Sequence, residues 1–399
     1  MIYDLSKSKI FDNNMSKLYN KNINRNHKQD SDVLFFRIGE NMNKKVMVAM
    51  SGGVDSSVAA VLLRDQGYDI CGATLKLFSN EDVLTSCRTR TCCSLEDVED
   101  ARSVCYKLGI EHFVFNFGDT FKEEVIKKFA SSYEEGNTPN PCIDCNRYIK
   151  FSKLIQRAIL MEKDYLASGH YAQIEFDKGS GRYLLKKAVD PLKDQSYVLY
   201  VLSQHDLSRT LLPLGGMHKT EVRKIAEERD LINARKPDSQ DICFVQDGDY
   251  AGFLENKMGV KSKKGKFVDI NGNVIGDHNG IIHYTVGQRK GLGVALGKPA
   301  YVINKNKTAN TVTLGSEEDL YSDRLETSDL NMIAVEKLTA PMKAMVKTRY
   351  SQKETEAILH PVDDDKILVE FKNKQRAITP GQAVVFYDGD IVIGGGTII

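Results

Sequence analysis

The chain has no excess of charge of one sign and no long hydrophobic run. It carries 55 Lys and Arg residues against 54 Asp and Glu residues, so its overall charge does not attract it to nucleic acid or to a membrane, although local basic patches still can. No apolar run approaches the length of a membrane-spanning helix, and the Asn- and Lys-rich beginning lacks the apolar core of a signal peptide. We therefore expect a cytoplasmic protein without a membrane partner.

The chain also lacks the high cysteine content of a disulfide-stabilised protein. Eight cysteines among 399 residues do not form a disulfide framework, and in a reducing compartment the clustered ones favour catalytic or metal-binding roles. They are Cys71, Cys87, Cys92, Cys93, Cys105, Cys142, Cys145 and Cys243. The adjacent pair Cys92 and Cys93 is poorly spaced for binding one zinc ion.

A lysine is missing from the glycine-rich stretch that follows the first apolar run. The stretch reads Ser51-Gly52-Gly53-Val54-Asp55-Ser56-Ser57. Without the lysine it is not a Walker-type GxxxxGK[ST] loop. Gly52 and Gly53 let successive N–H groups converge, and the two serines that follow Asp55 open a helix whose dipole favours an anion. The stretch predicts a phosphate-binding turn, although glycine turns without ligands are also common in α/β folds.

Three regions with different patterns follow an unusual beginning. Residues 1–43 hold many Asn, Lys and Ser, which indicates a poorly ordered extension, or a start site upstream of a working Met42. Residues 44–248 alternate strand and helix patterns and predict one α/β domain. Residues 249–308 predict a small central domain, and residues 309–399 predict a C-terminal β domain.

The first of these regions has the pattern of a doubly wound parallel sheet. Expected strands are 46–50, 70–77, 112–117 and 165–168, and expected helices are 56–66, 95–108, 121–133 and 147–161. Ligands of such sheets bind at the carboxyl ends of the strands. Leu75, at the end of one strand, is therefore expected beside an adenine, and Gly169 and His170 follow another strand at the same edge.

Short alternating runs bounded by Gly and Asn characterise the remainder of the chain. They begin at 266–274, and later runs are 311–314, 344–349, 367–371, 383–387 and 391–393. The later set predicts a C-terminal antiparallel barrel or sandwich.

Two segments place cysteines in a setting that suits chemistry. Cys142 and Cys145 lie three residues apart in a proline-stiffened loop just before the helix expected at 147–161, where the helix dipole lowers the pKa of a thiol. By itself a CxxC pair is a redox pair, half of a zinc site or part of an iron–sulfur site. Cys243 lies among polar residues, and taken alone it is equally a buried structural thiol.

Seven segments accompany the glycine-rich stretch and occur in a fixed order. They are NTPNPCIDCNRYIKF (137–151), ASGHYA (167–172), KDQSYVLY (193–200), DSQDICF (238–244), YTVGQRKGLG (284–293), VKTRY (346–350) and TPGQAVVFY (379–387). Together they closely resemble the bacterial tRNA 2-thiouridylases, also called tRNA-uridine 2-sulfurtransferases. The resemblance runs from about Lys45 to the last residue.

This resemblance implies a PP-loop domain of the adenine-nucleotide alpha hydrolase-like type, followed by a central domain and a barrel-like domain that contacts tRNA. It also implies that ATP, with Mg²⁺, adenylates the C2 oxygen of the wobble uridine in tRNAs for Lys, Glu and Gln, and that sulfur then displaces AMP. The ATP-binding residues that the resemblance assigns are Ala49, Met50, Ser51, Gly52, Gly53, Val54, Asp55, Ser56, Leu75 and Gly169.

The resemblance also assigns roles to two cysteines. Cys145 matches the nucleophile, and Cys243 matches the cysteine that carries persulfide sulfur from a donor protein, either a cysteine desulfurase or a relay. If the terminal persulfide sulfur attacks C2, the Cys145 thiolate can cleave the resulting S–S bond and leave a Cys145–Cys243 disulfide for a reductant to reset. The opposite order, in which Cys145 first releases hydrosulfide, fits the sequence equally.

Cys142 departs from the family pattern, because many relatives carry Asp at this position. Cys142, Cys145 and Cys243 can together occupy three corners of a [4Fe-4S] cluster whose fourth iron binds sulfur, and this route is the alternative to the persulfide. Another PP-loop ligase, such as an amidotransferase-type or argininosuccinate-type synthetase, does not need these thiols. A non-catalytic RNA-binding protein or a CxxC redox protein is a further alternative, but the intact Asp55 and the missing thioredoxin-like context argue against them.

Predicted tRNA contacts are spread over several of these segments, because a wobble base must leave its stack to reach the reaction site. They are Asn140, Pro141, Cys142, His170, Lys193, Asp194, Gln195, Arg349, Tyr350 and Gln382. The Gly-bounded loop 287–293 also suits phosphate contact. Without the resemblance, 193–195 is a solvated turn, Arg349 an exposed strand residue and His170 a sheet-edge histidine.

Overall fold

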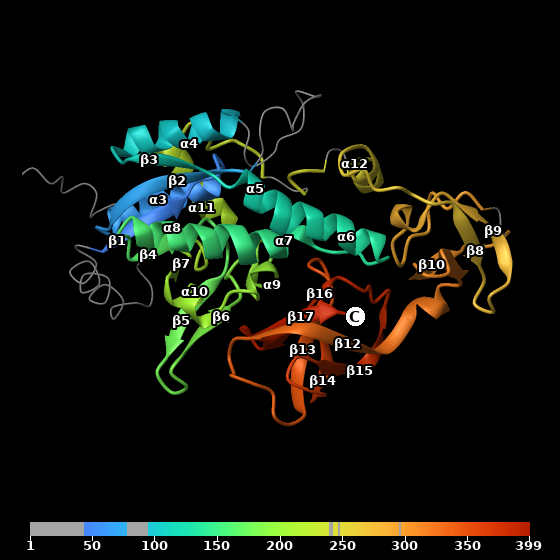
Figure 1. Cartoon of the computed structure of the whole chain (residues 1–399). Helices are drawn as coiled ribbons and strands as arrows, with labels where there is room; N and C mark the ends of the chain where they lie inside the picture. The colour runs from blue at the N-terminus through green and yellow to red at the C-terminus, as the bar shows by residue number, and fades with distance from the viewer. Residues whose placement is uncertain (1–43, 78–94, 239–241, 246–247, 295–296) are drawn as a thin grey trace, which may run out of the picture.

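The computed structural model describes residues 44–77, 95–238, 242–245, 248–294 and 297–399. The expected extension 1–43 and Cys87, Cys92 and Cys93 lie outside the described residues, as do residues 239–241 of the DSQDICF segment. Figure 1 shows a parallel-sheet domain, a smaller domain at the far end of the molecule and a β-barrel beneath them.

The first domain is built on a five-stranded parallel sheet, which confirms the predicted fold class. Its strands are β1 (Lys45–Ala49), β2 (Asp69–Lys76), β3 (His112–Asn116), β4 (Tyr165–Ala167) and β7 (Thr210–Leu211), in the order β3-β2-β1-β4-β7. The order runs one way from β1 to β3 and the other way from β1 to β7. The switch point, where such sheets bind ligands, therefore lies between β1 and β4.

Helices cover both faces of this sheet. They are α3 (Val54–Asp65), α4 (Leu95–Leu108), α5 (Gly118–Phe121), η1 (Lys122–Lys127), α6 (Lys128–Glu134), α7 (Pro141–Asp144), η2 (Cys145–Lys153), α8 (Leu154–Leu160), α9 (Ser196–Leu199), α10 (Gln204–Ser208) and α11 (Lys219–Glu228). Val58, Val104 and Val222 bring α3, α4 and α11 together in the core on one face. Phe121 and Phe151 belong to the core on the other face.

The helix expected at 147–161 begins earlier than predicted. Pro141 opens α7, and the Asn140 side chain accepts a hydrogen bond from the Cys142 backbone N–H at 3.1 Å. A capping Asn followed by Pro at the first helical position is a strong start signal. The prediction that Cys142 and Cys145 lie in a loop before the helix is therefore wrong, because both lie within its first turns.

The central domain has a small four-stranded sheet. Its elements are α12 (Tyr250–Asn256), β8 (Gly265–Val268), β9 (Val274–His278), η3 (Ile281–His283), β10 (Tyr301–Asn306) and β11 (Thr311–Gly315), with strand order β10-β11-β8-β9. The grouping of 311–314 with the C-terminal strands is wrong, because β11 pairs with β10 and β8. Phe129 and Tyr133 of α6 pack into the core of this sheet.

Six antiparallel strands close into the C-terminal barrel. They are β12 (Tyr321–Met332), β13 (Met342–Lys347), β14 (Thr355–Pro361), β15 (Ile367–Arg376), β16 (Ala383–Asp388) and β17 (Ile391–Ile398), preceded by η4 (Glu318–Leu320). Pairing of β12 with both β15 and β17 closes the ring, so the expected barrel is confirmed. The hairpin β5 (Gln173–Asp177) and β6 (Arg182–Lys186) extends the sheet of β17.

A loop of the barrel holds the segment that carries Cys142. The Thr138 N–H donates to the Pro380 carbonyl at 2.9 Å, and the Gln382 side-chain amide donates to the Thr138 carbonyl at 2.7 Å. Gly381, at φ +86°, lies against Asn137 and Thr138. The barrel therefore fixes the approach to helix α7.

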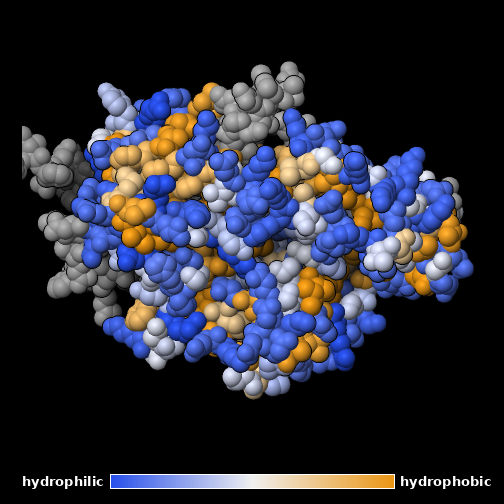
Figure 2. All heavy atoms as spheres, viewed as in Figure 1, coloured by the Kyte–Doolittle hydropathy of each residue, from blue (hydrophilic) through white to orange (hydrophobic). Residues whose placement is uncertain are grey.

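The surface agrees with the balanced composition. In Figure 2 hydrophilic residues cover most of the visible face, and hydrophobic residues are exposed in separate patches. Within the described part of the chain, no helix has both the length and the apolar character that crossing a membrane requires.

We predict that Gly381→Ala loosens the contact between the barrel and the catalytic domain. A Cβ at this position would lie 2.8 Å from the Asn137 Cβ and 3.0 Å from the Thr138 nitrogen, at a positive φ. We expect a loss of about 1–3 kcal/mol in the free energy of unfolding, measured by urea denaturation. Gly389→Ala is the matched control, because its φ is +58° and nothing lies within 4 Å of the new Cβ. Equal losses in the two variants would contradict the predicted clash.

Candidate active site

The predicted phosphate turn lies at the carboxyl end of β1. Gly52 has a φ of +72°, and a Cβ there would come within 2.4 Å of the Asp97 carbonyl oxygen, so only glycine fits. Gly53 caps α3 in extended conformation without a side-chain hydrogen bond. The first N–H groups of a helix have no partner within the helix, and they attract anions. The geometry of the turn therefore fits a phosphate group.

The serines of the turn hold its shape. The Ser51 N–H donates to Ser56 Oγ at 3.2 Å, and the Ser56 and Ser57 hydroxyls donate to the Gly53 carbonyl at 3.1 and 3.0 Å. From the other side, the Asn233 amide donates to the Gly52 carbonyl at 2.9 Å and to Ser57 Oγ at 2.8 Å. Asn233 is a site residue that the sequence reasoning missed.

The structure brings most predicted ATP-binding residues together. Residues 49–56 form the turn and the start of α3, and Gly169 follows β4 on the other side of the switch point. A Cβ on Gly169 would lie 2.6 Å from the Ser56 nitrogen, so Gly169 packs directly on the start of α3. Leu75 lies near the end of the neighbouring strand β2, and its side chain packs in the hydrophobic core with Met47.

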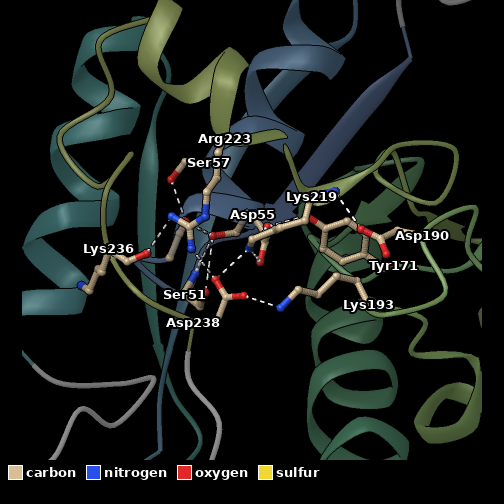
Figure 3. A network of polar contacts seen from close by, with 12 residues as sticks. Ser51, Asp55, Ser57, Tyr171, Asp190, Lys193, Lys219, Arg223, Lys236 and Asp238 are labelled. Carbon is tan, nitrogen blue, oxygen red and sulfur yellow. Dashed lines mark hydrogen bonds and ion pairs between the residues drawn. The ribbon is translucent and has the colours of Figure 1, made fainter. Parts of the chain in front are cut away.

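A cluster of ion pairs lies beside the turn (Figure 3). The Lys219 ammonium group lies 2.6 and 2.7 Å from the two carboxylate oxygens of Asp55, and 2.8 Å from Asp238 Oδ1. Tyr171 donates its hydroxyl to Asp55 Oδ1 at 2.7 Å. Two acidic side chains from segments far apart in the sequence therefore share one buried lysine.

Two further cations bind the Asp238 carboxylate. Lys193 reaches Oδ2 at 2.7 Å, and Arg223 reaches Oδ1 at 2.9 Å. Burial alone would raise the pKa of Asp238, but the hydrogen bonds from Lys193 and Lys219 lower it below its ordinary value. Lys193, a predicted tRNA contact, therefore lies in the ion-pair cluster next to the phosphate turn.

The sequence reasoning missed Lys219 and Arg223. Their signal was weak, because Lys219 opens helix α11, and a lysine in a helical pattern usually reads as a solvated residue. A cation at the first position of a helix opposes the helix dipole, and this anomaly was the available hint.

The cysteines fall into two groups. Cys71 and Cys105 are buried, and burial raises the pKa of both thiols, that of Cys105 to about 12, as in structural cysteines. Cys145 is 7% exposed and belongs to the same hydrophobic cluster against which Cys243 packs. Cys142 is exposed. Burial raises the pKa of the Tyr350 hydroxyl, and charge interactions with Asp194 and Cys142 raise it further.

The arrangement of the described residues does not fit the three-cysteine iron–sulfur alternative. Within those residues, no group of three or more His, Cys, Asp and Glu side chains is placed to hold a metal ion. We derive no step through a cluster.

Most predicted tRNA-contact residues make contacts within the protein. Asp194 Oδ1 accepts from the Ala188 N–H at 3.0 Å, and Gln195 Oε1 accepts from the Tyr171 N–H at 2.9 Å. The Tyr350 hydroxyl donates to the Asp194 carbonyl at 3.0 Å, which joins the barrel to this segment.

Arg349 and His170 are also held by neighbours. Arg349 donates to Thr379 Oγ1 at 2.6 Å and to the Ala377 carbonyl at 3.0 Å. His170 Nδ1 lies 2.8 Å from Ser168 Oγ, and burial, with help from Lys150, lowers the pKa of His170 to about 3. The imidazole is therefore neutral at physiological pH.

A cavity of about 410 Å³ lies between the first domain and the barrel. Its lining includes Asn140, Asp144 and Arg147 on one side and Gly381 and Thr397 on the other. Burial raises the pKa of Asp144 to about 6, although Lys128 and Arg147 oppose the shift. Arg147 crosses the boundary by an ion pair of 2.6 Å with Asp329.

The fold and the turn define a class of protein. A parallel sheet with a lysine-free SGGxDS turn at its switch point is an α/β domain of the PP-loop class, here joined to a central β domain and a barrel. Three family models match the chain in the same order. They are a tRNA methyl transferase HUP domain at 44–247, a tRNA methyl transferase PRC-barrel domain at 251–316 and an aminomethyltransferase beta-barrel domain at 322–398.

Relatives of high similarity extend over nearly the whole chain. The tRNA-specific 2-thiouridylase MnmA of Acetivibrio thermocellus is 53% identical over 355 residues, which cover 89% of this chain and 99% of the relative. The protein of the same name from Clostridioides difficile is 52% identical over 357 residues, covering 90% and 98%. The chain belongs to the tRNA-specific 2-thiouridylase family.

Two solved structures that resemble the chain each cover part of it. A 4-thiouridine synthetase–RNA complex with bound ATP has a TM-score of 0.32 at 19% identity, covering 54% of this chain and 50% of that chain. The NMN synthetase of Francisella tularensis has a TM-score of 0.34 at 16% identity, covering 58% and 80%.

We predict that Gly169→Ala weakens ATP binding. The new Cβ would collide with the Ser56 nitrogen and, at 2.7 Å, with the Asp55 carbonyl carbon, which displaces the N–H groups that face a phosphate. We expect the Kd for ATP, measured by calorimetry, to rise about tenfold, or ~1.4 kcal/mol. Gly216→Ala is the control, because nothing lies within 4 Å of its Cβ. Unchanged ATP affinity in a folded Gly169→Ala variant would contradict this role.

Proposed function

We propose that this chain is an ATP-dependent tRNA-uridine 2-sulfurtransferase that thiolates the wobble uridine of tRNAs for Lys, Glu and Gln in the cytoplasm. One observation carries the proposal: a phosphate-binding turn lies at the switch point of the sheet, in a chain that also brings Cys145 and Cys243 to one hydrophobic cluster. The names of the relatives, which are 2-thiouridylases, support it.

The phosphate turn serves the activation of the base. A carbonyl oxygen is a poor leaving group, and transfer of AMP from ATP to the C2 oxygen makes it a good one. The N–H groups at the start of α3 would hold the phosphates, and Mg²⁺ bound together with ATP would neutralise part of their charge. Pyrophosphate leaves in the first step and AMP in the second.

The two thiols serve the delivery of sulfur. A donor protein, a cysteine desulfurase or a relay, places a sulfane sulfur on Cys243, and the terminal sulfur of this persulfide attacks C2 as AMP departs. The Cys145 thiolate then attacks the Cys243 sulfur, which releases the thiocarbonyl and forms a Cys145–Cys243 disulfide. Two electrons from an external dithiol restore both thiols.

The barrel supports the same reaction from the tRNA side. Tyr350 donates to the segment that contains Asp194, and Gln382 holds the segment that precedes Asn140 and Pro141. Cys142 follows Pro141 and is exposed, so an extruded base could approach it there. In this proposal, Tyr350 and Gln382 position the segments that face the RNA, and they also contact the tRNA directly.

We predict that Cys145→Ser and Cys243→Ser separate activation from sulfur transfer. With unmodified tRNA, ATP and a persulfide donor, each variant should still release AMP slowly by hydrolysis of the adenylated base, while the rate of 2-thiouridine formation falls at least about a thousandfold. Mass spectrometry of digested tRNA measures the product.

Cys105→Ala provides the matched control, because its thiol is buried and its pKa is raised to about 12. This variant should keep thiolation within about twofold of the original rate. A Cys145→Ser variant that still thiolates tRNA would overturn the assignment.

A further inference from the structure

Lys219 is a buried cation that lies between two carboxylates. Its side chain is 10% exposed and lies between the carboxylates of Asp55 and Asp238, at 2.6 and 2.8 Å. It opens α11, where the positive end of the helix dipole disfavours a cation. Burial of a lysine at such a position costs free energy, so we expect a function that needs a cation there.

The backbone of Lys219 is anchored, whereas its side chain can move. Its N–H donates to Asp190 Oδ2 at 3.0 Å, and the preceding His218 N–H donates to Glu221 Oε2 at 2.7 Å. The start of α11 is therefore fixed beside the phosphate turn. A four-carbon side chain with three rotatable donors pivots from this fixed point.

Neither carboxylate depends on Lys219 alone. Asp55 also accepts the Tyr171 hydroxyl at 2.7 Å. Asp238 also binds Lys193 at 2.7 Å and Arg223 at 2.9 Å. If the Lys219 ammonium group moves away, Asp55 keeps Tyr171 as a hydrogen-bond partner. Asp238 keeps Lys193 and Arg223 as partners.

A phosphate on the turn needs a cation at this place. Asp55 is the second residue of α3, so a phosphate on the N–H groups of α3 lies next to a carboxylate of the same charge. The turn itself contains no lysine or arginine. The Lys219 ammonium group already contacts Asp55, so it lies beside the start of α3, where a phosphate would bind.

We propose that Lys219 is the phosphate-binding lysine of this site and exchanges its contacts with Asp55 and Asp238 for the β- and γ-phosphate oxygens of ATP (Figure 3). The inference rests on the proposed function, because it assigns a residue to the ATP step. Lys219 transfers no group in this step. It stabilises the charge that develops on pyrophosphate as the uridine oxygen attacks the α-phosphate.

The test compares nucleotides with and without the outer phosphates. Lys219→Met is titrated with α,β-methylene-ATP and with AMP by calorimetry, and its melting temperature is measured in parallel. We expect the Kd for α,β-methylene-ATP to rise at least about tenfold and that for AMP to change less than about threefold. Lys219→Arg, which keeps the charge, should recover part of the affinity.

Two further variants separate binding from structure. Lys224→Met, on the same helix, removes an exposed lysine that pairs with Glu228 at 3.7 Å, and it should leave both affinities unchanged. Lys219→Met combined with Asp238→Asn restores the local charge balance, so it should regain stability but not affinity for α,β-methylene-ATP. It also provides the binding measurement if Lys219→Met alone fails to fold.

Two results would overturn the inference. One is an affinity for α,β-methylene-ATP in Lys219→Met equal to that of the original chain, and the other is full recovery of that affinity in the charge-balanced double variant. Either result leaves the proposed function intact as long as the original chain binds ATP. An original chain that binds neither nucleotide would instead contradict the proposed function itself.

Discussion

The parallel pairing of β1 with β4 is the interaction on which the site depends. The register places Val48 beside Ala167, so the two strands end together and their exits meet. Gly169 then packs on the start of α3, and the absence of a side chain there lets Asp55 and Ser56 approach. This contact creates the phosphate turn, and it also brings β4 and the following Tyr171 within reach of Asp55. A nucleotide site at this edge follows from the order of the strands.

The barrel holds the segment that leads into the cysteine-bearing helix. Gln382 and Pro380 bind Thr138, and Asn140 and Pro141 then open the helix that carries Cys142 and Cys145. The thiols therefore lie at the positive end of a helix whose start is fixed from another domain. The same boundary contains the ion pair of Arg147 with Asp329, so a second contact joins the helix that carries the two cysteines to the barrel.

The sequence predicted the elements whose signal is local. The glycine turn, the strands around it and the barrel have short-range sequence patterns. The structure contains these elements, and their ends differ from the predicted ends by a few residues. The start of α7 was missed because Pro141 was interpreted as a loop residue, although Asn before Pro is also a start signal. Lys219 and Asn233 were missed for a different reason. Lys219 reaches Asp55 across 164 residues and Asn233 reaches Gly52 across 181 residues, and no local pattern shows such contacts.

In the proposed reaction the phosphate turn activates the C2 oxygen of uridine so that sulfur can replace it. Synthetic anticodon stem–loop RNA with ¹⁸O at C2 of the wobble uridine shows where this oxygen goes. After a single turnover with ATP and a persulfide donor, mass spectrometry follows the label. The account predicts one ¹⁸O in the phosphate group of AMP for each 2-thiouridine formed, because the oxygen leaves with AMP. Thiouridine formed together with unlabelled AMP would contradict it.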